Sequence, residues 1–328
     1  MSRRTGRLLT VSLAVGLVLS VGSAALAAPV GMLKQFKVPT ANSDPRAITN
    51  CSDGNRWFTE GTDSSLAPAK IGRVTPGGAI TEFDADCNFC ILTDIDQGPA
   101  GIVYMTSNNP ILVRFDVDTQ TLLPPIDIPD TGSAQEIDVD GDDVWFIADS
   151  NSLVRYNITA GQFTEFPLAF DKSPADVVID AQGDAWFTAP LDGTVNRFDP
   201  ETGAVAESFP VPDGLSPRSI TIATDGQLWF TSRFVPQGVG RLNPTTGVVS
   251  TFLTPSNPGP EGIAASPDGT VWFTQTMKGN VARIDNGGVI TEAKAVKNSE
   301  TFGITVAPNG NPWFTMMAAN KIATLQLQ

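Results

Sequence analysis

Arginine and glutamate side chains stand at the points of this chain where chemistry could be performed. Arg46, Arg218 and Glu261 each precede a short apolar stretch, whereas Glu60 and Arg233 each follow a Trp-Phe-Thr segment. Guanidinium and carboxylate groups together bind small polar ligands through charge-assisted hydrogen bonds. We therefore take these five residues as candidate ligand-binding positions. The alternative for each of them is a solvated loop side chain that contacts no ligand.

Carboxylates offer a second kind of chemistry, metal-assisted hydrolysis. Glu60, Asp94, Glu261 and Glu300 are candidate ligands of Mg²⁺ or Ca²⁺, with one of them acting as a base. Glu300 is also a ligand-binding candidate. These residues do not form a compact cluster of known spacing, so the cofactor stays open. An acidic run at residues 138–143 resembles a calcium loop, but it lies in a hairpin turn and lacks the spaced glutamate of an EF-hand.

Three cysteines, Cys51, Cys87 and Cys90, are present. A local disulfide between Cys87 and Cys90 is the first prediction, which leaves Cys51 as a buried free thiol within a strand. Pairing of Cys51 with one of the other two is an open alternative. No βαβ pattern surrounds the Cys-x-x-Cys segment, which argues against a redox role, and the chain has no histidine to complete a zinc site.

The elements that must position these residues follow from a repeated segment. All six tryptophans occupy one slot in it, and Tyr104 occupies the same slot in a seventh copy. The slots are Trp57, Tyr104, Trp145, Trp186, Trp229, Trp272 and Trp313, spaced 41 to 47 residues apart. A period near 40 residues with short strands and glycine turns is typical of β-propeller blades. One large aromatic residue per repeat predicts packing between neighbouring blades.

The two ends of the chain predict how the ring closes. The fourth strand of a repeat has the form Phe-x-x-Pro, as at residues 252–255. The same form occurs at residues 36–39, before the first repeat, and the chain ends with a third strand at residues 321–325. We predict an all-β fold of seven four-stranded blades, with the N-terminal strand completing the last blade. Residues 28–328 then form a single domain.

Loops at one mouth of a propeller channel usually bind the ligand. The loops that enter each first strand offer Arg46, Thr93, Ala175, Arg218, Glu261 and Phe302, and those between second and third strands offer Glu60, Asp149, Arg233, Gln275 and Met316. Arginines also recur on the third strand. We interpret these as structural, paired across strands with Glu82, Glu165 and Glu292.

Residues 1–27 predict a secretory signal peptide, because three arginines precede an apolar stretch and Ala25-Leu26-Ala27 fits a cleavage site. Export by the general or the twin-arginine route is open. Without this segment the chain carries 18 basic and 35 acidic residues. Such a charge argues against nucleic acid and anionic membranes as partners. We expect a secreted monomer that binds a small polar ligand, an extracellular protein or a glycan.

The repeat, with Pro-x-x-Ile, Asp-Gly-x-x-Trp-Phe-Thr and Thr-Gly elements, resembles the streptogramin (virginiamycin B) lyases over essentially the whole mature chain. The resemblance implies a seven-bladed propeller. It also implies an elimination that opens a cyclic depsipeptide at its ester C–O bond, using a base and a magnesium ion.

The family's catalytic positions carry other residues in this chain. The positions of its two histidines hold Glu261 and Phe302, Glu300 matches one glutamate, and Met317 replaces the other. Phenylalanine cannot accept a proton. Three hypotheses follow: a lyase-like propeller that binds a ligand or partner without this chemistry, a metal-dependent lactonase-type enzyme, or a streptogramin lyase with Glu261 as base.

Overall fold

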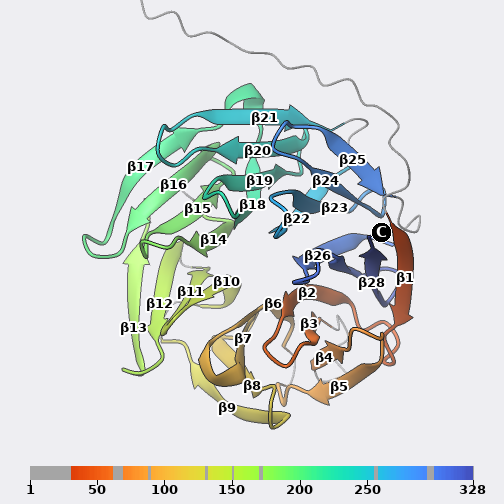
Figure 1. Ribbon diagram of the computed structural model, residues 1–328. Helices are drawn as coiled ribbons and strands as arrows, with labels where there is room; N and C mark the ends of the chain where they lie inside the picture. The colour runs from red at the N-terminus through yellow and green to blue at the C-terminus, as the bar shows by residue number, and fades with distance from the viewer. Residues whose placement is uncertain are drawn as a thin grey trace, which may run out of the picture.

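The strands form a ring of seven antiparallel sheets, each of four strands (Figure 1). The computed structural model describes residues 31–61, 69–87, 90–129, 132–149, 151–169, 173–254, 258–293 and 299–327. The predicted signal peptide lies outside these residues. No helix within the described residues is both long and apolar enough to span a bilayer.

Each of the first six blades runs in chain order from an inner to an outer strand. The first blade contains β2 (Pro45–Asn50), β3 (Arg56–Glu60), β4 (Lys70–Val74) and β5 (Ile80–Asp84). The second contains β6 (Leu92–Gln97), β7 (Ile102–Ser107), β8 (Ile111–Asp116) and β9 (Thr121–Asp127). The third contains β10 (Ala134–Asp140), β11 (Asp143–Ala148), β12 (Ser152–Asn157) and β13 (Gln162–Pro167).

The remaining blades follow the same order. The fourth contains β14 (Asp176–Ile179), β15 (Ala185–Ala189), β16 (Thr194–Asp199) and β17 (Ala204–Pro210). The fifth contains β18 (Pro217–Ile222), β19 (Leu228–Ser232), β20 (Gly238–Leu242) and β21 (Val249–Leu253). The sixth contains β22 (Pro260–Ala265), β23 (Val271–Gln275), β24 (Asn280–Ile284) and β25 (Ile290–Ala293). The seventh contains β26 (Thr301–Val306), β27 (Pro312–Met316) and β28 (Lys321–Gln326), with β1 (Met32–Lys37).

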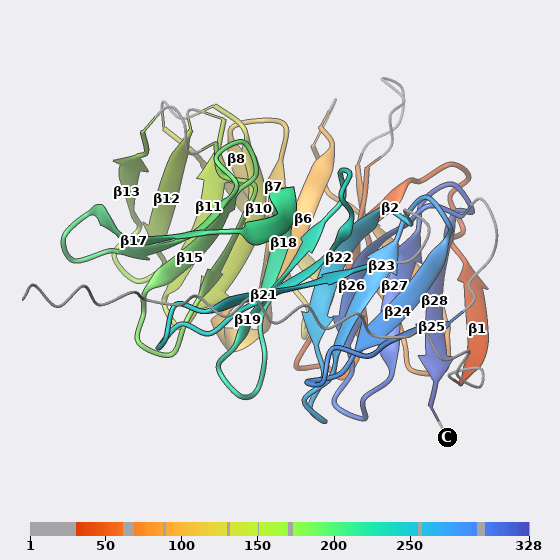
Figure 2. The ribbon, with the colours of Figure 1, turned by 90° about the horizontal axis from the view of Figure 1, so that it is seen from above.

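The N-terminal strand closes the ring, as predicted. Strand β1 pairs antiparallel with β28 along all six of its residues, from Met32 opposite Gln326 to Lys37 opposite Lys321. Figure 2 shows β1 beside β28 at one edge of the molecule. Closure gives the last sheet its fourth strand and covers an edge that would otherwise offer unpaired backbone groups.

The tryptophan slot lies between blades, also as predicted, because Trp229 of the fifth blade packs in one core cluster with Ile263 and Phe273 of the sixth. Trp229 is fully buried and stacks on Phe252 of the outer strand, with ring centroids 5.8 Å apart. The guanidinium of Arg241 lies over the Trp229 ring, 5.3 Å from its centroid. The same arrangement occurs where Arg73 covers Trp57. Arg73, Arg155 and Arg241 of the third strands therefore pack on aromatic rings, which is a structural role. Arg197, at the same position in the fourth blade, pairs instead with Asp184 and Glu207.

The predicted partners of these arginines were wrong. In the first blade Arg73 lies opposite Thr81, and Glu82 lies opposite Gly72. Because successive side chains of a strand point to opposite faces, Glu82 projects away from Arg73. Glu82 instead accepts hydrogen bonds from the backbone and hydroxyl of Thr40 at 2.8 and 2.9 Å.

Hydrogen bonds between neighbouring inner strands join the blades around the ring. Between the second and fifth blades carboxylates accept backbone N–H groups: Asp94 accepts from Ile137 N at 3.0 Å, Asp138 from Ile179 N at 2.8 Å, and Asp176 from Ile220 N at 2.8 Å. Thr106 and Thr188 also donate there, to Gln135 O and Arg218 O of the following blades. Between the fifth blade and the first, the donors are threonines of the Trp-Phe-Thr segment: Thr231 donates to Glu261 O at 2.7 Å, Thr274 to Phe302 O at 2.8 Å, and Thr315 to Arg46 O at 2.6 Å. Thr49 and Asp96 join the first and second blades at 3.2 Å.

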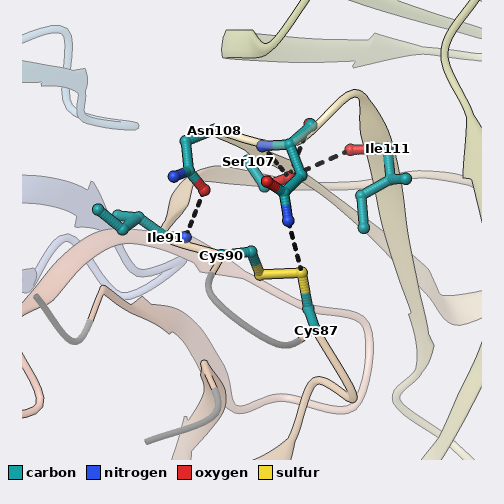
Figure 3. Close-up of a disulfide and its surroundings, with 7 residues drawn as sticks. Cys87, Cys90, Ile91, Ser107, Asn108 and Ile111 are labelled. Atoms are coloured by element: carbon teal, nitrogen blue, oxygen red, sulfur yellow. Dashed lines mark hydrogen bonds between the residues drawn. A yellow bond between two sulfur atoms is a disulfide. The ribbon is translucent and has the colours of Figure 1, made fainter. Parts of the chain in front are cut away.

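A disulfide joins Cys87 and Cys90 in the segment that leads into the second blade (Figure 3). Both cysteines are buried, and the Ile91 backbone beside them donates to Asn108 Oδ1 at 2.6 Å. Cys51 is free and half-buried. It follows β2 instead of lying within a strand, and burial is the main cause that raises the pKa of its thiol.

Candidate functional site

Bulges on the inner strands direct side chains toward one end of the channel. The register between first and second strands shifts within residues 217–220 of the fifth blade and residues 260–263 of the sixth. A bulge bends its strand locally and re-aims the side chains at that point. Arg218 and Glu261 occupy the equivalent position in these two bulges, and they form an ion pair across the seam between the blades.

A cavity of about 240 Å³ occupies the channel. Six carboxylate residues belong to its lining: Asp94, Asp96, Glu136, Asp138, Asp176 and Glu261. Thr93 and Phe302 line it as well. Of the residues singled out from the sequence as site candidates, Thr93, Asp94, Glu261 and Phe302 therefore line a common cavity.

The carboxyl groups in the channel hold their protons more tightly than free carboxyl groups do. Burial, followed by the charge of Asp176, raises the pKa of Glu136 to about 8. Burial, followed by the charge of Asp96, raises the pKa of Asp138 to about 8. Burial also raises the pKa of Asp94 well above its usual value, with Glu136 as the next cause. Glu136 and Asp138 are therefore largely protonated at neutral pH, because burial and mutual repulsion disfavour their ionised forms.

Glu261 is the most deeply buried acid of this lining and has two arginine partners. Its side chain is 3% exposed and is paired with Nε of Arg218 and, at 2.9 Å, with Nη1 of Arg233. The contact with Arg233 brings the charges together, but Glu261 Oε2 has no aligned hydrogen-bond donor within the described residues. Burial alone would lower the pKa of Arg218, yet Glu261 outweighs it and raises that pKa. The Arg218–Glu261–Arg233 cluster thus fixes three charged groups at the channel.

Exposed apolar side chains lie at the same end of the ring as this cluster. Leu191, Phe234, Val235 and Met277 are 83%, 62%, 74% and 64% exposed. They lie in the loops β15–β16, β19–β20 and β23–β24, which join the second and third strands of three consecutive blades. These loops therefore share one end of the ring, and Phe234 directly follows Arg233. We call these four residues the apolar rim. Such grouped exposure is a feature of ligand or partner sites.

Several predicted site residues lie outside the cavity lining. Arg46 is paired with Asp44, with Nη2 2.8 Å from Oδ2. Glu300 is exposed, and its backbone carbonyl accepts a hydrogen bond from Met317 N at 3.1 Å. The family-equivalent positions thus divide into two groups: Glu261 and Phe302 line the cavity, whereas Glu300 and Met317 do not.

Glu60 does not face the channel either. It ends β3 fully buried beside Glu82, and neither of its carboxylate oxygens has an aligned hydrogen-bond partner within the described residues. Burial, followed by the charge of Glu82, raises the pKa of Glu60 to about 8. The four metal-ligand candidates therefore do not converge, and no group of three acidic or cysteine side chains in the described part of the chain is arranged to bind a metal. The acidic residues 138–143 are also dispersed, since Asp138 lines the channel and Asp143 bonds Asn157.

Replacing Glu60 with glutamine should change how stability depends on pH. The pKa of Glu60 is about 8 in the folded protein and about 4.3 in an unfolded chain, so the folded state binds the extra proton. Its contribution is fully present below about pH 4 and is lost as the pH rises through 8. We expect Glu60→Gln to be a few kcal/mol more stable than the parent at pH 9, since each tenfold change in proton affinity corresponds to about 1.4 kcal/mol.

Urea denaturation at pH 5, 7 and 9 measures this difference. The exposed Glu207→Gln variant is the control, because Glu207 lies on the outer strand β17. The channel carboxyls contribute to the pH dependence of both proteins, so the difference between Glu60→Gln and parent is the quantity to compare. If the free energy of unfolding changes equally with pH in Glu60→Gln and in the parent, the proposed effect of Glu60 on the pH dependence is wrong.

Four cavity residues were not predicted from the sequence: Asp96, Glu136, Asp138 and Asp176. A signal was present: Asp94 with Asp96, and Glu136 with Asp138, are each two residues apart on an inner strand, which places both members of a pair on one face. Assigning that face to the channel required the register of the inner strands.

The comparisons with known proteins agree with this architecture. A family model described as the virginiamycin B lyase family matches residues 24–188 and 112–328. A solved streptogramin B lyase is 26% identical with a TM-score of 0.81, covering 91% of this chain and 98% of that one. A virginiamycin B lyase from Staphylococcus aureus is 23% identical with a TM-score of 0.79, covering 90% and 99%.

A catalytically inactive variant of the S. aureus enzyme, solved with quinupristin, is 23% identical with a TM-score of 0.80, covering 90% of this chain and 99% of that one. A search of curated proteins found no match. The matched residues span the described ring, and each of its seven blades has the predicted four strands. The chain belongs to the virginiamycin B lyase family.

Proposed function

We propose that this protein binds a small ligand at the rimmed end of its channel, without the elimination chemistry of its relatives. The observation that carries the proposal is the buried Glu261 between Arg218 and Arg233, at the same end of the ring as the exposed apolar rim. Fixed polar groups at the base of an apolar opening are the usual composition of a small-molecule site. The predicted signal peptide supports a location outside the cytoplasm.

The residues at the family's catalytic positions support binding without catalysis. The chain has no histidine, and Phe302 lines the cavity with a side chain that cannot accept a proton. Glu261 is the one acid at an equivalent position in the lining, and it is engaged by two guanidinium groups. A general base must bring an oxygen within hydrogen-bond reach of the proton that it removes, and both oxygens of Glu261 already contact arginine nitrogens.

The ligand that fits this end has an apolar body and a polar part. The apolar rim extends over three blades and would bury hydrocarbon surface, at roughly 25 cal/mol per Å² removed from water. The Arg218–Glu261–Arg233 cluster would orient the polar part by hydrogen bonds. Quinupristin, present in the structure of the inactive relative, is a suitable probe for this proposal.

Calorimetric titration with quinupristin tests the proposal. We expect measurable binding to the parent protein and at least tenfold weaker binding to Phe234→Ser/Val235→Ser. Val248→Ser is the matched control, because Val248 is also exposed, at 59%, but lies in the β20–β21 turn at the opposite end of the blade. Its affinity should equal that of the parent.

Chromatography of the same mixture tests for catalysis. Elimination would yield a linear isomer of equal mass but different retention, whereas we expect the cyclic compound to be recovered unchanged. Formation of the linear product would overturn the claim of binding without chemistry. If the rim variant and the parent bind quinupristin with equal affinity, the apolar rim does not contact the ligand.

A further inference from the structure

The two arginines of the Arg218–Glu261–Arg233 cluster have hydrogen-bond donors to spare. Arg218 donates to Glu261 through Nε, and Arg233 contacts the same carboxylate through Nη1 at 2.9 Å. A guanidinium carries five N–H groups, and within the described residues no other acceptor bonds those of the two arginines. Their side chains are 35% and 33% exposed. The remaining N–H groups are therefore available to a ligand at the mouth of the channel.

The cluster carries a net positive charge. Two guanidinium groups face one carboxylate, which leaves one positive charge in excess. The other acids of the lining do little to cancel it, because burial raises the pKa of Glu136 and of Asp138 to about 8 and keeps both largely protonated at neutral pH. Burial also raises the pKa of Asp94, Asp96 and Asp176. The mouth should therefore attract an anion and repel a cation.

Hydrogen bonds link the loops of the apolar rim to the loops that carry the arginines. Ser216 lies two residues before Arg218. Its hydroxyl donates to Pro190 O at 3.0 Å, in the β15–β16 loop of the fourth blade. Its backbone N–H donates to Ser232 Oγ at 3.0 Å, directly before Arg233. One residue thus joins the rim loop of the fourth blade to both arginine-bearing segments of the fifth.

A second buried residue makes the link to the sixth blade. Gln237, in the β19–β20 part of the fifth blade, is 4% exposed. Its Nε2 donates to Met277 Sδ at 3.9 Å, and its Oε1 accepts the backbone N–H of Gly259 at 2.7 Å. The apolar rim and the two arginines therefore belong to one hydrogen-bonded set of loops, with the unused guanidinium N–H groups beside exposed hydrocarbon.

We propose that this end of the channel binds an amphipathic carboxylate, a molecule with a single carboxylate group on an apolar body. The unused N–H groups of Arg218 and Arg233 bind the carboxylate oxygens through charge-assisted hydrogen bonds, which are about twice as strong as neutral ones. The apolar rim covers the hydrocarbon part of the ligand. Glu261 holds the two guanidinium groups in place. This inference rests on the proposed function and names the charge of the polar part of the ligand.

Calorimetry with octanoate tests the inference at pH 7 and constant ionic strength. We expect octanoate to bind at least tenfold more tightly than n-octylammonium, which has the opposite charge on the same chain. We expect the same advantage over acetate, which has the charge without the chain, because burial of about two methylene groups already gives a tenfold difference. Phe234→Ser/Val235→Ser should lower the affinity for octanoate toward that for acetate.

Two substitutions in the cluster should act in opposite directions. Arg233→Gln removes a positive charge and its N–H groups, and it should weaken octanoate binding at least tenfold. Glu261→Gln removes the carboxylate that competes with the ligand, and it should tighten octanoate binding at least threefold. A site that used Glu261 to bind the polar part of its ligand would show the reverse. Lys34→Gln, on the outer strand β1, removes the same charge at an exposed position and should bind as the parent does.

Urea midpoints establish that each variant is folded. The inference is overturned if n-octylammonium binds as tightly as octanoate, or if Arg233→Gln and Glu261→Gln both leave the affinity for octanoate unchanged. Rim-dependent binding of quinupristin without binding of octanoate would retain the proposed function and reject only the carboxylate. Absence of binding by both probes would reject both proposals.

Discussion

Deletion of residues 31–39 should prevent the ring from folding. Within this segment, β1 supplies the fourth strand of the seventh blade. Phe36 stacks on Trp313 with ring centroids 5.7 Å apart, and Val38 is fully buried. Each buried apolar side chain contributes about 1.5–3 kcal/mol and each backbone hydrogen bond about 1 kcal/mol. Together these losses approach the total stability of a typical domain, about 5–15 kcal/mol.

The exposed edge left behind adds a second penalty. Without β1, the backbone of β28 would offer unpaired N–H and C=O groups to other chains. We therefore expect aggregation as well as loss of native structure. Size-exclusion chromatography and far-ultraviolet circular dichroism measure the two effects separately.

Two proteins serve as controls for this deletion. Removal of residues 1–30 alone keeps β1 and should leave the urea midpoint unchanged. A circular permutant that links residue 327 to residue 31 and opens the chain in the β20–β21 turn also keeps every strand, and it should fold. A monomeric, cooperatively unfolding product of the deletion would contradict the importance of closure.

Replacement of both Arg218 and Arg233 by methionine should destabilise the protein by about 3 kcal/mol. The two arginines are the ion-pair partners of Glu261, whose side chain is 3% exposed. Removing the partners of a buried charge costs about 3–5 kcal/mol, because the charge stays buried without compensation. We expect the lower end of this range, since both arginines are about one-third exposed and their attraction is partly screened.

The reverse change separates the charge from the packing. Adding Glu261→Met to the double variant removes the uncompensated acid, so most of the lost stability should return. Urea denaturation of the parent, double and triple variants at pH 7 provides the comparison. A triple variant as unstable as the double one would show that packing of the arginine side chains, and not the burial of charge, determines the loss.

The blades and their closure could be predicted because the information is local. Trp229, Phe230 and Thr231 specify one strand, and their equivalents recur in the other blades with little change. The structure adds a reason for the threonine: Thr231 donates to the backbone of Glu261 in the next blade. Likewise, the match between residues 36–39 and residues 252–255 was enough to assign β1 to the last blade.

The face of the strand from which a single side chain projects was harder to predict, as Glu60 shows. Glu60 directly follows the threonine of its segment, whereas Arg233 lies one residue further along. A step of one residue reverses the face of a strand. Arg233 consequently reaches Glu261, whereas Glu60 is buried beside Glu82. Gln275, at the position of Glu60, similarly bonds Glu292 at 3.1 Å.

The acids of the channel depend on contacts between blades, which the order of residues within one repeat does not contain. Asp138 falls next to a hairpin turn and was interpreted as part of it. In the structure its carboxylate accepts the amide hydrogen of Ile179 in the following blade. The same holds for Asp176 and Ile220. Only the assembled ring shows that these residues share a cavity.

The bonds between inner strands have a consequence for how the molecule comes apart. Hydrogen bonds between inner strands join each pair of neighbouring blades, through carboxylates such as Asp94, Asp138 and Asp176 and through threonines such as Thr188 and Thr315. A stack of repeats with two open ends can lose its terminal units first, but a circle has no terminus from which to fray. Releasing any one blade leaves both neighbours with unsatisfied buried groups. The protein should therefore melt in a single all-or-none step, with no population of partly unwound rings.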